Sequence, residues 1–175
     1  MMVWTRRFNL YLALVAALAL LCGCQMFRHK GPTAALRVHI QTNPDALGTS
    51  QTISVMRSDP VLVTISRNPI LTEANLIAAK VINSPGGFAI EVQFDENGTW
   101  LLEQYSAANP GQHLAIFGQW GDKLANGRWL AAPLIRNRIA NGKLVFTPDA
   151  SRDEADQLVL GLNQFAVENR KGQLK

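Results

Sequence analysis

The chain has almost no cysteine. Its two cysteines, Cys22 and Cys24, both lie at the end of an apolar N-terminal run. The sequence after Cys24 therefore offers no disulfide, no thiolate nucleophile and no cysteine ligand for zinc. We expect the folded part to be stabilised by packing alone.

A strong charge of one sign is also missing. The chain has 17 basic and 13 acidic residues, a formal net charge of +4. The first 23 residues hold two of the basic ones, which leaves 15 basic against 13 acidic residues. No dense Lys/Arg cluster follows residues 28–30. Nucleic-acid binding generally uses a basic stripe, so we expect no nucleic-acid partner.

A catalytic constellation is the third absence. Of the three histidines, His29 precedes the strand-rich region. We expect His39 and His113 to be exposed strand residues, because neither has a ligand at metal-binding spacing. Gly86-Gly87 leads into a predicted strand, whereas a phosphate loop opens a helix. The sequence thus predicts no catalytic residue, no metal site and no cofactor, and a protein that is not an enzyme.

The N-terminal segment has the pattern of a secretory signal peptide. Arg6-Arg7 precedes the apolar run 10–22, which is shorter than the roughly 20 residues of a membrane span. Residues 21–24, Leu-Cys-Gly-Cys, resemble the lipobox of bacterial lipoproteins. That resemblance implies cleavage before Cys24 and attachment of a diacylglyceryl group to its sulfur, so that the protein contacts the membrane through a lipid anchor.

Three alternatives for this segment stay open. Residues 8–27 carry no charge and could form an uncleaved anchor. Residues 5–7 could begin a twin-arginine signal, although the residues that follow fit that pattern poorly. Cys22 could carry the lipid, but the bulky Leu21 before it makes a poor cleavage position.

The remaining sequence is dominated by predicted strands. Alternation of apolar and polar residues has the period of a half-buried strand. The predicted strands cover residues 36–40, 53–55, 61–65, 81–82, 90–94, 114–117, 129–135 and 144–146.

Three helices are predicted between these strands. Thr72 is the predicted N-cap of a short helix over residues 73–79, and a second helix is predicted over 99–108. Ser151 and Glu154 form a capping box before the last helix. Few helices and short connections favour an α+β fold, a mainly antiparallel sheet with two or three helices packed on one face.

We divide the chain accordingly. The predicted parts are a lipoprotein signal peptide (1–23), a lipidated tether (24–34), a strand-rich N-terminal part of the domain (35–87), an α+β part (88–168) and a tail (169–175).

An ordered set of segments covers residues 88–161. FAIEVQFDENGTWLLEQYSAANPGQHLAIFGQW is followed by RWLAAPLI and then by GKLVFTPDASRDEADQLVLGL. This set resembles the head subdomain of the large periplasmic domain (P1) of SecD, an accessory subunit of the bacterial protein-export translocase. Residues 71–79 are similar to the short helix that precedes the head strand in that family. The resemblance implies a SecD P1-head-like fold and contact with extended or unfolded chains, but it does not by itself supply an activity.

The chain also departs from the family pattern. Residues 118–127 are longer than the family's tight hairpin, and Trp120 and Trp129 flank them. We predict that Trp120 and Trp129 contact a partner; the alternative is that both rings only cover the sheet. The sequence lacks SecD's membrane helices, so we expect no coupling to proton flow.

These observations predict a non-enzymatic, lipid-anchored periplasmic protein that acts by protein–protein interaction in protein export or envelope assembly. The expected partners are exported or unfolded polypeptides, or translocase and envelope proteins. Gln25 is not the Asp that commonly retains lipoproteins at the inner membrane, which favours the outer membrane. A purely structural envelope lipoprotein and a small-ligand-binding exported domain remain open.

Overall fold

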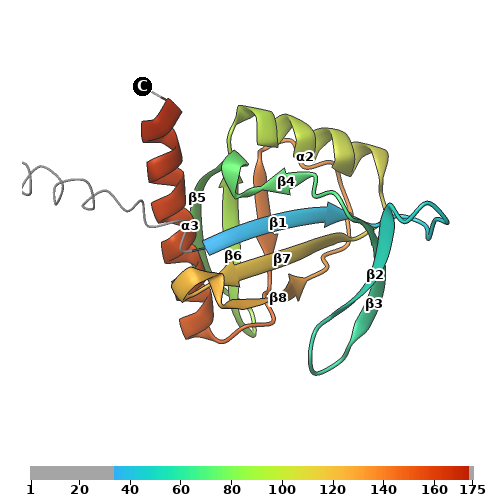
Figure 1. The fold of residues 1–175 in the computed structure, drawn as a ribbon, viewed down its shortest axis with the longest axis horizontal. Helices are drawn as coiled ribbons and strands as arrows, with labels where there is room; N and C mark the ends of the chain where they lie inside the picture. The colour runs from blue at the N-terminus through green and yellow to red at the C-terminus, as the bar shows by residue number, and fades with distance from the viewer. Residues whose placement is uncertain (1–33, 174–175) are drawn as a thin grey trace, which may run out of the picture. The chain divides into compact units, whose positions relative to one another are not determined.

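The computed structural model describes residues 34–173 (Figure 1). The predicted signal peptide, Cys24 and the tether up to residue 33 lie outside the described residues. Ala34, the last residue assigned to the tether, already belongs to the first strand. No helix in the described part is long and apolar enough to cross a membrane.

Strands outnumber helices within residues 34–173. The elements are β1 (Ala34–Ile40), β2 (Ser50–Val55), β3 (Val61–Ser66), β4 (Leu71–Thr72), the 3₁₀ turn η2 (Glu73–Asn75), β5 (Leu76–Ser84), β6 (Gly87–Phe94), α2 (Glu96–Ala108), β7 (Leu114–Trp120), the 3₁₀ turn η3 (Asp122–Leu124), β8 (Asn126–Ala131), β9 (Lys143–Phe146) and α3 (Arg152–Gln173).

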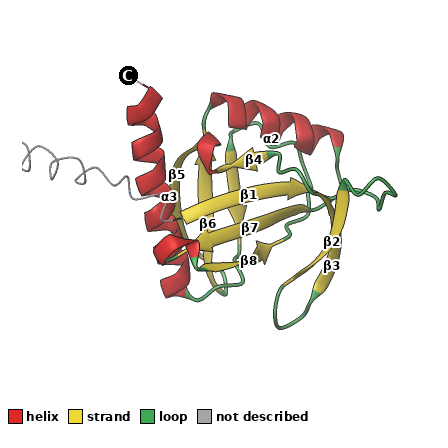
Figure 2. Cartoon of the chain, viewed as in Figure 1, coloured by secondary structure: helices red, strands yellow, loops and turns green. Residues whose placement is uncertain are grey.

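The strands form three antiparallel sheets. Sheet A has the order β4-β1-β7-β8, sheet C has the order β5-β6-β9, and β2 and β3 pair as a separate hairpin. The strands of sheet A run across those of sheet C, with α2 above them in this view and α3 at one side (Figures 1 and 2). The predicted α+β, mainly antiparallel class is confirmed.

The main core lies between the inner faces of sheets A and C and extends to both helices. Trp120 and Phe94 are its largest fully buried side chains. Gly118 of β7 faces a tightly packed part of this core: a Cβ added there would lie 2.5 Å from Leu130 Cδ1 of the neighbouring strand β8 and 3.4 Å from Leu158 Cδ2 of α3. Glycine at this position leaves room for the Leu130 side chain of β8 in the main core.

A second, smaller core covers the outer face of sheet A. Here the β2–β3 hairpin places Val63 and Ile65 against Ala115 of β7, and Ile53, Trp129 and Ala132 pack around them. Strand β1 is consequently buried on both faces except at Arg37. The predicted alternation of buried and exposed residues in this strand is therefore wrong, because both faces of sheet A are covered.

The predicted helix over residues 73–79 is also wrong beyond its first turn. Thr72 does cap, since its hydroxyl accepts the Ala74 N–H and the Asn75 side chain accepts the Thr72 N–H. Only one 3₁₀ turn follows, and residues 76–84 form β5 along β6. Pairing with β6 outweighs the local helical signal.

Other boundaries differ by a few residues. Strand β8 ends at Ala131, whereas the prediction extended it to residue 135. Beyond its end, Leu134 forms an isolated β-bridge with His113. Helix α2 begins at Glu96, and α3 continues to Gln173 through most of the predicted tail.

Candidate interaction surfaces

Trp120 and Trp129 point to opposite sides of sheet A. Trp120 is 1% exposed and belongs to the main core. The Arg128 guanidinium lies 5.0 Å from the Trp120 ring centroid and pairs with Glu154 at the start of α3. Trp120 therefore packs against the β7–β8 hairpin on the inner face of sheet A. Its ring is not accessible to a partner in this conformation.

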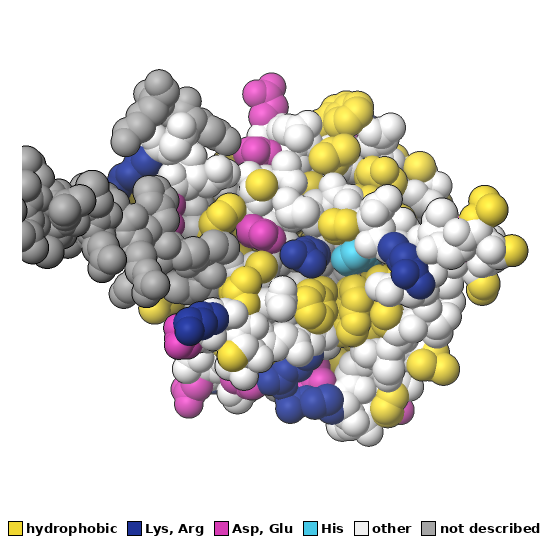
Figure 3. Space-filling model, in the orientation of Figure 1, with side chains coloured by type: hydrophobic (Ala, Val, Ile, Leu, Met, Phe, Trp, Pro, Cys, Tyr) yellow, Lys and Arg dark blue, Asp and Glu magenta, His cyan; other side chains and the backbone are white. Residues whose placement is uncertain are grey.

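Trp129 is half-buried on the outer face and forms an aromatic shelf with Phe117. Their ring centroids lie 5.1 Å apart, and Arg37, Phe117 and Trp129 occupy one row across β1, β7 and β8. Gly127 leaves room beside the shelf, since a Cβ there would lie 3.3 Å from Phe117 Cζ. Hydrophobic side chains gather over β7 and β8 on this face, with Lys and Arg around them (Figure 3).

His39 and His113 are not the exposed residues that we expected. His39 is 5% exposed; its Nδ1–H donates to the Ser66 carbonyl at 2.8 Å, and its ring contacts Trp129 edge-on. Burial lowers the pKa of His39, partly offset by the bond to Ser66. His113 is partly buried, and its Nδ1–H donates to Gln41 Oε1 at 2.8 Å. Both act in packing, because the β2–β3 hairpin covers this end of sheet A.

An ion pair fastens the tip of that hairpin. The backbone N–H of Arg57 donates to Asp149 Oδ2 at 2.9 Å, and its Nε and Nη2 contact the same carboxylate at 3.1–3.2 Å. Arg57 lowers the pKa of Asp149 through these hydrogen bonds. The hairpin is thus held at its tip as well as at its base, beside the aromatic shelf.

Two outer sheet edges are closed by polar contacts. At the β5 edge, the Ala79 N–H donates to Asn163 Oδ1 at 2.8 Å and Asn163 Nδ2 donates to the Ala79 carbonyl at 2.9 Å. At the β8 edge, the Asp149 N–H donates to the Leu130 carbonyl at 2.7 Å. Exposed edges can pair with other chains, so contacts of this kind limit unwanted association.

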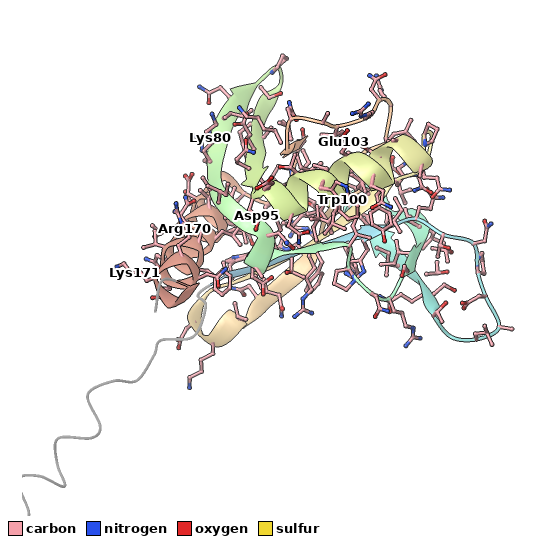
Figure 4. All side chains as sticks on the ribbon, turned by 90° about the horizontal axis from the view of Figure 1, so that it is seen from above. Lys80, Asp95, Trp100, Glu103, Arg170 and Lys171 are labelled. Carbon is pink, nitrogen blue, oxygen red and sulfur yellow. The ribbon has the colours of Figure 1, made fainter. Side chains whose placement is uncertain are left out.

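Helix α2 carries an exposed aromatic residue that the sequence analysis missed. Trp100 is 59% exposed, with Glu103 farther along α2 and Asp95 at its N-terminus (Figure 4). Asp95 is occupied as the N-cap and accepts the Gly98 N–H at 2.7 Å. The buried residues of α2 are Gly98, Leu102 and Ser106, and Trp100 lies on the other side of the helix, a spacing that could have marked it as a surface residue.

Several charged groups of the described residues form ion pairs. Lys80 and Lys143 lie 3.1 and 3.7 Å from the Glu91 carboxylate and lower its pKa. Arg138 pairs with Glu103. Within residues 34–173 no three His, Cys, Asp or Glu side chains are grouped as metal ligands.

Comparison with solved structures places this fold beside that of SecDF. The structure of "a membrane component SecDF that enhances protein export" matches at 23% identity and a TM-score of 0.53, over 76% of this chain and 63% of that chain. A crystal structure of SecDF in a super-membrane-facing form matches at 24% identity and a TM-score of 0.52, over 76% of this chain and 19% of that chain. The chain spans less than two thirds of either.

The sequence comparisons give one family. A search of curated proteins finds no match. The model of the SecDF P1 head subdomain matches residues 50–167, which is more than half of the chain, and confirms the resemblance drawn from residues 88–161. The chain therefore belongs to the SecDF P1 head subdomain family.

Proposed function

We propose that this protein is a non-enzymatic, lipid-anchored component of the bacterial cell envelope that contacts exported polypeptides on the periplasmic side. The family match over residues 50–167 is the observation that carries the proposal. A similar structure is described as a membrane component that enhances protein export, and this role is extended here to a chain that spans only part of that protein.

The contact surface in this proposal is the aromatic shelf of Phe117 and Trp129. Aromatic side chains offer a large apolar area at a low cost in conformational entropy and are enriched at binding sites. Both rings are partly accessible on the outer face of sheet A. Trp120 supports the same hairpin from the core side, so its contribution to binding is indirect.

A capture experiment tests this role. The full-length chain is incubated with an unfolded exported protein, and retention is measured for the wild type, Trp129→Ala and a matched control, Trp100→Ala on α2. We expect Trp129→Ala to weaken capture about tenfold, the loss typical of a contributing interface aromatic, and Trp100→Ala to leave it unchanged. If neither variant changes capture while both remain folded, the shelf is not the contact surface. If the wild type captures no exported chain, the proposed role itself fails.

The anchor and the location are part of the same proposal. Cys24 is the proposed acylation site, and Gln25 alone supports the outer rather than the inner membrane. The intact mass of the purified mature protein, together with the membrane fraction in which it sediments, tests both. A mature chain without acyl mass, or full anchoring of Cys24→Ala, contradicts lipidation. Recovery with the inner membrane contradicts the Gln25 argument and leaves the anchor intact.

A purely structural role is the competing outcome. It predicts stable co-purification with a membrane complex and no affinity for unfolded chains, so the capture assay separates the two hypotheses.

A further inference from the structure

The register of β9 leaves one sheet edge with open backbone groups. Phe94 of β6 donates its N–H to the Gly142 carbonyl at 2.9 Å, and the two strands then pair as Val92 with Leu144 and Glu91 with Val145. Hydrogen-bonded and non-hydrogen-bonded pairs alternate along an antiparallel ladder. Leu144 therefore directs its N–H and C=O toward β6, and Val145 directs both groups away from it.

The outward groups of β9 are only partly satisfied. The Lys143 N–H is capped by Asn141 Oδ1 at 3.1 Å. Among the described hydrogen bonds, none is made by the N–H or C=O of Val145. The Val145 side chain is itself 47% exposed. Unlike the edges at Ala79 and Leu130, this edge keeps a donor and an acceptor available at one residue.

A cavity of about 490 Å³ adjoins this edge. Val145 and Leu144 line one side of it, and residues 133–141 line the rest together with Leu114 and Lys143. Its volume lies within the usual range of ligand sites. The 45% exposed Leu134 adds apolar surface.

The charges that line the cavity are all positive. Arg136, Arg138 and Lys143 contribute cations, and its lining has no Asp or Glu. Glu103 neutralises Arg138, and Glu91 partly neutralises Lys143. Arg136 is exposed and has no acidic partner among the described residues. An arginine fork binds a carboxylate particularly well, because it can donate two parallel hydrogen bonds.

We infer that the β9 edge binds an extended, acidic segment of a polypeptide by strand addition. The segment pairs with the outward N–H and C=O of Val145, and its carboxylates face Arg136 and Lys143. Main-chain pairing supplies affinity in this mode, and the side-chain surroundings select the sequence. This inference deepens the proposed function and rests on it, because it names the class of segment that an exported partner would present.

Synthetic peptides supply the probe. The first is a seven-residue peptide of alternating Glu and Val, the second replaces Glu by Lys, and the third is the Glu peptide with an N-methyl group on every residue. We expect the Glu peptide to bind the full-length chain, and the Lys peptide to bind at least tenfold more weakly. The N-methylated peptide should not bind, because it has lost the backbone donors. Binding should also slow amide exchange at Val145 but not at Leu144.

Variants of the protein test the same contacts from the other side. Val145→Pro removes the outward N–H without deleting a bond to β6, and we expect it to weaken the Glu peptide about tenfold. Val145→Thr keeps the N–H and serves as its control. Arg136→Glu should weaken the Glu peptide and strengthen the Lys peptide, whereas Lys171→Glu on α3 should change neither. Circular dichroism verifies that each variant is folded. If Val145→Pro unfolds, the inference is tested by the binding of the N-methylated peptide and by amide exchange at Val145 in the wild type.

Three results would overturn the inference: equal affinity of the N-methylated and parent peptides, no protection of the Val145 amide, or no binding of any peptide. Failure here is distinct from failure of the proposed function. A chain that captures unfolded exported proteins but ignores these peptides keeps the export role and loses the strand-addition site. A chain that binds the Glu peptide but captures no exported protein has the edge site without the export role.

Discussion

Asn163 is the residue on which closure of the β5 edge depends. Its side-chain amide makes a reciprocal pair of hydrogen bonds with the N–H and C=O of Ala79, at 2.8 and 2.9 Å, across the contact between α3 and β5. Asn163→Leu keeps a side chain of similar size and removes both bonds. Because α3 still covers the edge, water reaches the two Ala79 groups poorly.

The expected cost follows from the unsatisfied groups. A partly buried donor or acceptor left without a partner costs about 1–3 kcal/mol, so two cost roughly 2–6 kcal/mol. Domains of this size have a total stability of about 5–15 kcal/mol. We therefore expect a large fall in the urea midpoint, measured by circular dichroism, with little change in the m-value. Asn169→Leu on the same helix is the control, since Asn169 makes a single exposed bond to Ala74 at 3.2 Å.

Asn163→Asp adds a pH test of the same geometry. One carboxylate oxygen would face the Ala79 carbonyl, and this repulsion together with partial burial raises the pKa of the new carboxyl in the folded state. Stability is then highest below the pKa of an unfolded Asp, about 4, and falls as the pH rises through the raised folded value. A cost below about 0.5 kcal/mol for Asn163→Leu, or no pH dependence for Asn163→Asp, would refute this account of the edge.

Three further predictions concern stability and are measured by urea unfolding. Trp120→Ala should cost about 3–5 kcal/mol, as expected for deleting a buried aromatic ring, whereas Trp129→Ala should cost clearly less; equal costs would contradict their different burial. Gly118→Ala should cost about 1–3 kcal/mol by overpacking the contact with the Leu130 side chain of β8, and a neutral result would show that this side chain moves aside. Arg57 lowers the pKa of Asp149, so their pair stabilises above the unfolded Asp pKa and is lost as the pH falls through the lowered folded value; Asp149→Asn should abolish this part of the acid sensitivity, and an unchanged profile would exclude it.

Local sequence patterns predicted correctly those helices and strands that tertiary contacts also favour. Ser151 and Glu154 form the expected capping box, because the Ser151 hydroxyl accepts the Glu154 N–H and the Glu154 carboxylate accepts the Ser151 N–H. Alternation over residues 90–94 identified β6, whose Ile90, Val92 and Phe94 side chains all enter the main core. In both places a short sequence pattern is sufficient, since no distant segment competes with it.

Long-range contacts explain the failures. The N-cap at Thr72 is predicted correctly, but the hairpin with β6 makes residues 76–84 extended. His39 shows the matching problem for a strand. Its polar position in the alternation predicted exposure, yet the β2–β3 hairpin buries it. Period-two patterns distinguish the two faces of a strand and do not reveal when both are covered.

The sequence alone could not predict on which face of sheet A each tryptophan lies, because this depends on the sheet register. Trp120 and Trp129 lie on neighbouring antiparallel strands, so nine residues of separation do not say whether they share a face. The register pairs Trp129 with Phe117 and Trp120 with Asn126, and a bulge interrupts the ladder after Ile116. One ring consequently enters the main core and the other lies on the outer face.

The aromatic shelf and the β9 edge belong to different sheets and have no residue in common, so one pair of variants can separate their roles. A seven-residue peptide that pairs with β9 should respond to Val145→Pro and not to Trp129→Ala. A long unfolded chain should respond to both if it uses both surfaces, and the losses in binding free energy should add, as expected for independent sites. If Trp129→Ala weakened the short peptide as strongly as Val145→Pro, the two surfaces would form one site, and the assignment of the acidic segment to β9 alone would be wrong.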